Sequence, residues 1–238
     1  MKKVRIADEK IYVDDRHHQN PKEYFKLILS EINFLFDKNK KHDKKTIIDV
    51  GCANGALLSY LRKAFPDAKL KGFDPIDSLI SSGKRIDSSI DFYKMGLMDI
   101  PKLNEEEKAD IVISTGVIGI FDNPDIFLGH LLKLVKKNCS ILVFSPFNSD
   151  PVDVILQYRH SGGDTWETGH NLFSLQTMHE LAEKYNLELD VIDFKMPFRI
   201  EKTDDPMRSW TEPFRDNPHT LIYGTNMFST MKLLVFKA

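Results

Sequence analysis

The chain is poor in cysteine and tryptophan, and it has no long apolar run. Its two cysteines, Cys52 and Cys139, are too few for a disulfide framework, and both fall at the ends of expected buried strands. No apolar stretch reaches the roughly 18 residues that a membrane-spanning helix needs. The basic residues after Met1 are not followed by an apolar signal-peptide core, so we expect a cytoplasmic protein.

The chain also has no large excess of charge of either sign. Lys and Arg number 33 and Asp and Glu 35, which leaves a net charge of −2 and no basic face for nucleic acid. The one basic run, residues 38–45, is interpreted as a solvated linker. Adjacent His17 and His18 have no histidine four residues away and no nearby cysteine, so no metal site is predicted. The length of 238 residues, 42% of them hydrophobic, suits a single main domain.

A glycine turn between an expected strand and an expected helix is the most informative stretch. Residues 46–50 are mostly β-branched and apolar, which predicts a buried parallel strand, and 56–65 are apolar at helical spacing. The turn reads Asp-x-Gly-x-Ala-x-Gly, neither the Gly-x-Gly-x-x-Gly of a dinucleotide site nor a Walker A loop. We expect Gly51 to turn the backbone, Gly55 to admit a ligand closely, and Ala53 to keep a negative φ.

A second expected strand, 70–74, ends in an acid. Asp74 lies 19 residues after Gly55, where nucleotide-binding folds place a carboxylate that accepts both ribose hydroxyls. The alternative is a turn-forming Asp before Pro75. Further strands are expected at 91–95 and 109–117.

This order of motifs resembles the class I S-adenosylmethionine (SAM)-dependent methyltransferases, of the small-molecule type. The resemblance implies that the turn wraps the methionine part of SAM, that Asp99 accepts the adenine amine, and that Met98 lies on the ring. It also implies S-adenosylhomocysteine (SAH) as the product. The cofactor-binding residues that follow are Asp49, Gly51, Cys52, Ala53, Asn54, Gly55, Asp74, Pro75, Met98, Asp99, Thr115, Gly116 and Val117.

The fold class that the resemblance implies is α/β. It is a doubly wound, seven-stranded, mostly parallel sheet with helices on both faces and an antiparallel last strand. We expect one helix within 121–137 that starts around Asn123 and Pro124, the fifth strand over 140–146, a helix over 175–185 capped by Ser174, and the last strand over 227–236.

Two segments flank this core and bear on the acceptor. Residues 1–45 are expected to form an N-terminal helical cap or lid ahead of a SAM-binding domain over 46–238. Residues 195–225 form an aromatic and basic insertion before the last strand, which either closes over an anionic or sugar-nucleotide substrate or only covers the sheet edge.

The loop after the fifth strand, residues 147–172, carries the candidate catalytic residues. Methyl transfer to oxygen requires removal of a proton, and histidine suits that role near neutral pH. His170 is the first candidate base and His160 the second; the alternative is an ordinary loop with exposed histidines. Ser114 to Val117 replaces the Pro-Pro-Tyr/Phe motif of many N-directed relatives, which favours a small or oxygen acceptor.

The function predicted is SN2 transfer of a methyl group from SAM to a small hydroxylated metabolite, with sugar or polysaccharide intermediates among the candidates. Two alternatives stay open. One is a non-catalytic SAM- or nucleoside-binding protein or partner subunit. The other is an RNA methyltransferase, which a basic face or an added RNA domain would have favoured. The sequence does not indicate the oligomeric state.

Overall fold

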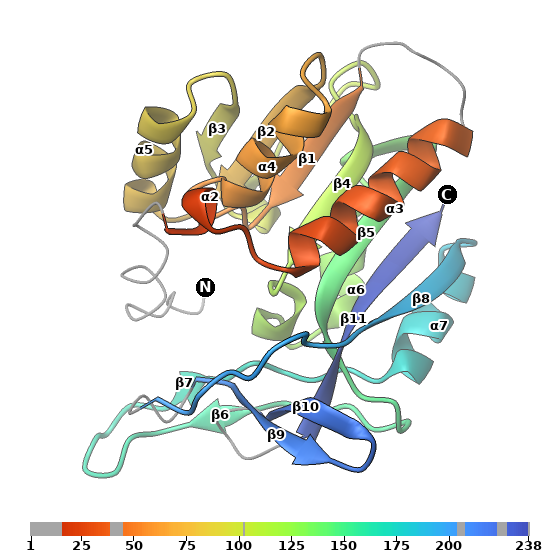
Figure 1. Ribbon diagram of the computed structural model, residues 1–238. Coiled ribbons are helices and arrows are strands. Elements are labelled where there is room, and N and C mark those ends of the chain that lie inside the picture. Colours follow the sequence, from red (N-terminus) through yellow and green to blue (C-terminus); the bar gives the residue numbers. More distant parts are fainter. Residues whose placement is uncertain (1–15, 39–44, 102, 204–207, 223–227, 238) are drawn as a thin grey trace.

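The computed structural model describes residues 16–38, 45–101, 103–203, 208–222 and 228–237 (Figure 1). Residues 1–15 and 39–44 of the expected cap, which include most of the basic run at 38–45, therefore lie outside the described residues. The division into a cap and a SAM-binding domain stays a prediction. Among the described residues, no helix is long and apolar enough to span a membrane.

Five parallel strands form the nucleotide half of the sheet, in the spatial order β3-β2-β1-β4-β5. They pair in parallel register, for example Ile48 with Lys71 and with Val112. This doubly wound order confirms the expected fold class. The strands are β1 (Thr46–Val50), β2 (Lys69–Asp74), β3 (Asp91–Lys94), β4 (Ala109–Thr115) and β5 (Val135–Phe147).

The antiparallel half begins at β11 (Phe228–Lys237), which pairs with β5 on one side and with β8 (Glu188–Phe194) on the other. The last strand, β11, thus lies between β5 and β8, the fifth and sixth strands of the seven-stranded core, as expected. The insertion supplies two more strands, β9 (Trp210–Phe214) and β10 (Asn217–Ile222), and β10 pairs with the start of β11. The described sheet therefore has nine strands.

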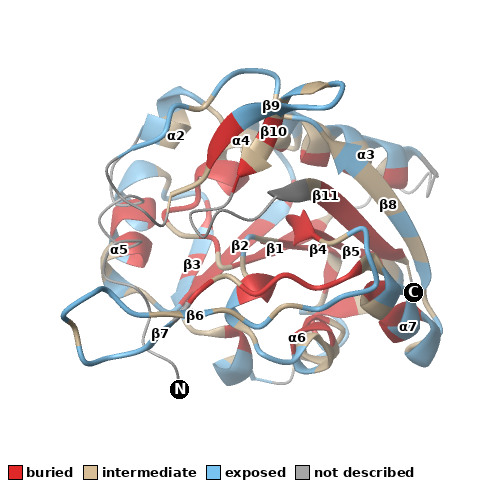
Figure 2. Ribbon diagram, turned by 90° about the horizontal axis from the view of Figure 1, so that it is seen from below, coloured by how far each residue is buried: buried red, intermediate tan, exposed pale blue. Residues whose placement is uncertain are grey.

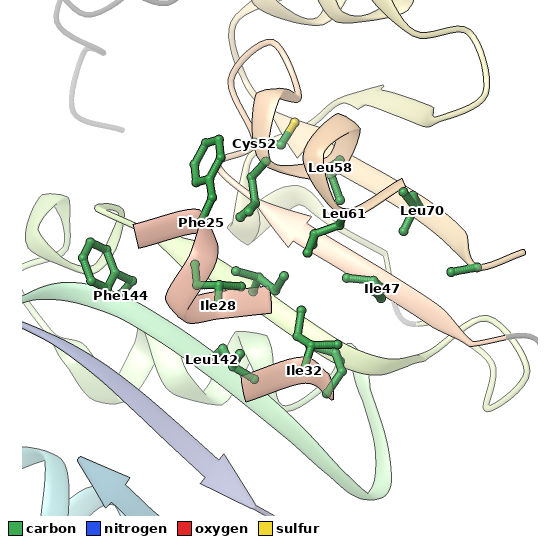
Figure 3. Close-up of a cluster of buried hydrophobic side chains, with 14 of the residues drawn as sticks. Phe25, Ile28, Ile32, Ile47, Cys52, Leu58, Leu61, Leu70, Leu142 and Phe144 are labelled. Carbon is green, nitrogen blue, oxygen red and sulfur yellow. The ribbon is translucent and has the colours of Figure 1, made fainter. Parts of the chain in front are cut away.

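Helices cover both faces of the sheet (Figure 1). The helices are α2 (Arg16–Gln19), α3 (Tyr24–Lys38), α4 (Ala56–Ala64), α5 (Asp77–Ile86), α6 (Pro124–Leu131) and α7 (Leu175–Lys184), with 3-10 turns η1 (Leu97–Asp99) and η2 (Ile118–Ile120). Alternate residues of β1 point to opposite sides: Ile47 packs in the cluster that includes α3 and α4, and Ile48 in the cluster that includes α6 and α7. The first cluster, drawn in Figure 3, places Ile28 and Ile32 of α3 in the domain core.

The expected helix within 121–137 begins at Pro124 after the Asn123 cap, as predicted, but its predicted end is wrong. The helix α6 ends at Leu131, and β5 already begins at Val135, which pairs with Ala109. The apolar spacing of this stretch fits a helix and a buried strand equally well, and pairing with β4 decides it. Ser174 caps α7 as expected, because its side chain accepts a hydrogen bond from the Thr177 amide.

Two hairpins lie at the carboxyl ends of the parallel strands. One consists of β6 (Gln157–Tyr158) and β7 (Glu167–Thr168), and the other of β9 and β10. Figure 2 shows them on either side of the ends of β1, β4 and β5. Ligands of open α/β sheets bind at this edge, so the residues that matter are those in its turns.

Candidate functional site

The turn after β1 follows a left-handed course at three of its positions. The φ angle is +78° at Gly51, +50° at Ala53 and +80° at Gly55. The prediction of a negative φ at Ala53 is therefore wrong, and a residue with a Cβ bears a cost of about 1–2 kcal/mol there. The Asp74 carboxylate offsets this cost, because its Oδ2 accepts a hydrogen bond from the Ala53 amide at 3.0 Å.

Both glycines of the turn are also required by close packing. A Cβ on Gly51 would lie 2.3 Å from Cγ2 of Val117, so the turns after β1 and β4 are in contact. A Cβ on Gly55 would lie 2.3 Å from Cζ of Phe92. Gly55 thus permits a close approach to the Phe92 ring of β3, and its expected approach to a ligand stays a prediction.

Cys52 and Asn54 are buried inside the turn. A Cβ on Gly72 would lie 2.7 Å from the Cys52 sulfur, which shows how tightly the thiol packs against β2. Burial raises the pKa of Cys52 well above its usual value, and the charges of Asp49 and Asp74 add to that rise. The thiol is therefore a packing group and not a nucleophile. Cys139, expected to be buried, is half-buried.

Asp74 is buried at the end of β2, and backbone amides hold both of its oxygens. Oδ2 accepts from Ala53 as described, and Oδ1 accepts from the Ile76 amide at 2.9 Å. Burial raises the pKa of Asp74, and the two amide hydrogen bonds partly oppose the rise. Each carboxylate oxygen has a second lone pair for a ligand, so the geometry fits the ribose role without testing it.

Asp49 is a buried carboxylate whose Oδ1 has no hydrogen-bond partner among the described residues. Burial, followed by the negative charge of Asp74, raises the pKa of Asp49 to about 7. A buried acceptor without a partner costs free energy, and such groups gather at functional sites.

The turn after β3 brings Pro75, Gly96 and Asp99 together. A Cβ on Gly96 would lie 3.1 Å from Oδ2 of Asp99 and 3.9 Å from Cβ of Pro75. Asp99 is exposed in η1, and Met98 beside it is 49% exposed, so both side chains are accessible to a ligand. This geometry fits the expected adenine side of the site.

The turn after β4 lies next to the ends of both neighbouring strands. The Ser114 hydroxyl donates to the Val50 carbonyl at 3.0 Å, and the Gly116 amide donates to the Phe144 carbonyl at 2.8 Å. A Cβ on Gly116, whose φ is +71°, would meet nothing within 4 Å. Thr115 to Val117 therefore bounds open space at the edge of the sheet.

The structure places His170 beside this turn. The Asn171 amide donates to the Gly119 carbonyl at 2.7 Å, and a Cβ on Gly119 would lie 3.4 Å from Nδ1 of His170. Asn171 is buried and anchors the loop. Its Oδ1 accepts from the Leu156 amide, and its Nδ2 donates to the Phe121 carbonyl. No sequence pattern indicated this role for Asn171.

His160 lies elsewhere, exposed between β6 and β7. Its ring stands perpendicular to the Tyr158 ring with centroids 5.8 Å apart. No contact in the described part of the chain joins it to the turn after β4, so geometry ranks His170 ahead of His160.

His18 contacts the glycine turn, although its sequence context indicated only a lid or solvated histidine. Its Nε2 lies 3.2 Å from the Asn54 carbonyl oxygen, and its Nδ1 is buried without a partner among the described residues. The contact joins α2 to the turn after β1. The described residues contain no cluster of three or more His, Cys, Asp or Glu side chains arranged for a metal ion.

Comparison with known proteins shows the family to which the chain belongs. The family model of the methyltransferase domain matches residues 17–191. The chain belongs to the class I SAM-dependent methyltransferases, a family whose cofactor is SAM. The unpartnered oxygen of Asp49 fits a cofactor that carries a sulfonium and an ammonium group.

Relatives with curated names are methyltransferases. Protein 235L of Invertebrate iridescent virus 6, named as a methyltransferase, is 30% identical over 49% of this chain and 43% of its own length. A malonyl-[acyl-carrier protein] O-methyltransferase of Priestia megaterium is 26% identical over 66% of this chain and 59% of its own. The chain thus spans about half the length of the curated relatives it matches.

Solved structures share the fold at low sequence identity. The plantazolicin methyltransferase BpumL, in complex with a desmethyl-plantazolicin analogue and SAH, superimposes with a TM-score of 0.60 at 16% identity, covering 98% of this chain and 92% of that one. A structure of the Haloferax volcanii Trm112 activator with a methyltransferase gives 0.62 at 14% identity, covering 99% of each chain.

Proposed function

We propose that this protein transfers the methyl group of SAM to an oxygen atom of a small hydroxylated acceptor. In this proposal the turn after β1 and Asp49 hold the methionine part of SAM, Asp74 and Pro75 the ribose, and Met98 and Asp99 the adenine. Residues 115–117 border the reacting atoms. SAM supplies an activated methyl group, so the protein's main task is alignment of the acceptor for in-line displacement.

The position of His170 carries the proposal. Its Nδ1 lies beside Gly119, two residues after Val117, and the buried Asn171 holds the loop in place. An imidazole at this edge can take the proton of a hydroxyl acceptor as the oxygen is methylated. His160 is the alternative base, provided that the β6–β7 hairpin folds toward the site.

A second candidate is methylation of a carboxylate on an acyl thioester. It is favoured by the relatives of this chain that are named malonyl-[acyl-carrier protein] O-methyltransferases. A carboxylate acceptor is already ionised at neutral pH and needs no base. The importance of His170 therefore discriminates between the two candidates.

The test is SAH release by the purified protein with a panel of hydroxylated metabolites and of carboxylated acyl thioesters. With a hydroxyl acceptor, His170→Gln is expected to lower kcat about 100-fold or more, and SAH affinity is expected to stay within twofold. His160→Gln tests the alternative base, and His179→Gln, at an exposed position of α7, is the control. Full turnover of His170→Gln would exclude His170 as the base. Transfer confined to the acyl thioesters would establish the second candidate, and SAM binding without transfer to any acceptor would favour a non-catalytic binding protein.

A further inference from the structure

The side chain of His18 reaches the backbone of the turn after β1 from outside the sheet. Its Nε2 lies 3.2 Å from the Asn54 carbonyl oxygen, and a carbonyl only accepts, so this nitrogen carries the proton and donates. The other ring nitrogen, Nδ1, is buried without a partner among the described residues. The hydrogen bond to Asn54 is therefore the polar contact that orients the ring.

The Asn54 carbonyl belongs to the peptide group between Asn54 and Gly55, and hydrogen bonds hold that group at both ends. The amide of the same peptide group, on Gly55, donates to the Cys52 carbonyl at 2.9 Å. Gly83 of α5 leaves room for the carbonyl, because a Cβ there would lie 2.9 Å from its oxygen. His18 thus fixes the carbonyl end of the peptide group, and Cys52 fixes the amide end.

Glycine makes this peptide group easy to turn over. Gly55 has a φ of +80°, and glycine adopts positive and negative φ about equally readily. A flip of the planar peptide changes chiefly ψ of Asn54 and φ of Gly55, so the hydrogen bonds at its two ends oppose the flip. Gly55 also precedes α4, which has no side-chain cap. The orientation of the peptide therefore depends on contacts such as that with His18.

Helix α2 is placed by its neighbours and not by close packing around His18. It lies beside α4, and residues 20–23 join it to α3, which packs in the domain core (Figure 1). His18 also lines a cavity of about 300 Å³ between α2, α4 and the end of α5, with Pro21 and Tyr60 among the other lining residues. Steric fit therefore does not enclose the side chain, and its hydrogen bond to the turn is its specific contact.

We propose that His18 is a positioning residue for the cofactor, which holds the peptide group between Asn54 and Gly55 in the orientation that SAM binding requires. This inference rests on the proposed function, in which the turn after β1 holds the methionine part of SAM, and it deepens that function. It gives α2 the task of setting the shape of the cofactor turn without touching the cofactor. If α2 only covered α4, SAM affinity would not depend on the donor at His18.

Two substitutions place an amide group at one or the other ring-nitrogen position. The side-chain NH2 of His18→Gln takes the place of Nε2 and can donate to Asn54, whereas that of His18→Asn takes the place of Nδ1 and ends too early. By calorimetry we expect His18→Asn to bind SAM about tenfold more weakly, the effect of one lost hydrogen bond. We expect His18→Gln to stay within about twofold of the unmodified protein. Asn20→Ala, at an exposed side chain just after α2, is the control.

The product provides a further comparison. SAM and SAH should weaken by the same factor in His18→Asn, because they share the part that the turn is proposed to hold. Weakening of SAM alone would mean that His18 senses the methyl group directly, and the positioning role would then be wrong. Equal losses in His18→Gln and His18→Asn would also overturn it, because the donor at the Nε2 position would then not matter.

Hydrogen exchange measured by NMR separates a local change from a loss of the fold. Without ligand, the Gly55 amide should exchange about tenfold faster in His18→Asn, and saturating SAH should restore its protection. Amides of β4, which pairs with β1 and β5, should keep their protection and show that the domain is folded. Weaker SAM binding with unchanged exchange at Gly55 would overturn the inference, because the effect would then not pass through this peptide group.

Failure of the inference is distinguishable from failure of the proposed function. If the unmodified protein did not bind SAM, the proposed role of the turn would be wrong, and the inference with it. If the unmodified protein bound SAM and His18→Asn bound it equally well, only the inference would be overturned.

Discussion

At the scale of single residues, we expect the raised pKa of Asp49 to make stability depend on pH. The folded protein holds a proton on this acid up to about pH 7, whereas an unfolded chain releases it near pH 4. The native state therefore binds more protons between these values, and the stability of the ligand-free protein should fall as the pH rises from about 4 to 7. Asp49→Asn mimics the protonated acid, so we expect a flatter profile and a gain of a few kcal/mol at pH 8.

Urea denaturation at several pH values measures this effect. Asp74 has a pKa raised in the same direction and should leave a residual slope in the variant. Exposed Asp67→Asn is the control and should follow the unmodified protein. An Asp49→Asn protein that kept the full slope, or lost stability at pH 8, would contradict this account.

A glycine can be required by a left-handed backbone or by a neighbour that leaves no space for a Cβ. Gly51 and Gly116 allow the free-energy costs of these two effects to be measured separately. Both have positive φ, but only at Gly51 would a Cβ also meet a neighbour, Val117. We expect Gly116→Ala to cost about 1–2 kcal/mol for the left-handed backbone alone. Gly51→Ala should cost about 1–3 kcal/mol more for the clash.

The measurement is again the free energy of unfolding, with Val117→Ala added to form a double-mutant cycle. Removing the Val117 methyl groups should recover the clash part of the Gly51→Ala cost and leave the backbone part. Equal costs at the two glycines would show that the contact between the turns after β1 and β4 is not rigid.

At the scale of elements, the strand–turn–helix units could be predicted from the sequence. Segments whose structure depends on pairing with a distant strand could not. The glycine turn, the acid ending β2 and the Ser174 cap are local signals, because each depends on a few neighbouring residues. The start of β5 is different. Leu134 and Val135 fit a helix by spacing, but the Leu134 carbonyl accepts the Ala109 amide from β4, and that partner lies far away in the sequence. The positive φ of Ala53 likewise depends on the distant Asp74.

The loop that carries His170 depends on one buried amide. Asn171 joins Leu156, on the same loop, to Phe121, just after η2. Asn171→Ala leaves these backbone groups without partners, so we expect a loss of about 2–4 kcal/mol and faster hydrogen exchange over 152–172. Exchange mass spectrometry measures it. Trp166→Ala, at a side chain that is 61% exposed on the same loop, should change neither quantity by much.

At the scale of the whole molecule, the site is assembled from turns that the sequence keeps far apart. The order of strands was predictable, and with it the meeting of the turns after β1, β2, β3 and β4. The strands of the insertion, β9 and β10, were not, because they form by pairing with each other and with the start of β11. Long-range pairing decides such features.

Ligand binding at this shared edge should stabilise the whole domain. A ligand that binds only the folded state at 100 times its Kd adds about 2.7 kcal/mol. For a chain of this size each kcal/mol raises Tm by about 2–4 °C, so SAM or SAH should raise it by about 5–10 °C, and NAD should not.

Asp74→Ala removes the acceptor of the Ala53 and Ile76 amides, so we expect a lower starting Tm and loss of the ligand-induced shift in Tm. Asp77→Asn, which removes an exposed charge paired with Lys94, should retain it. A full SAM shift in Asp74→Ala would mean that the turn after β1 keeps its shape without this carboxylate, and the ribose assignment would then be wrong.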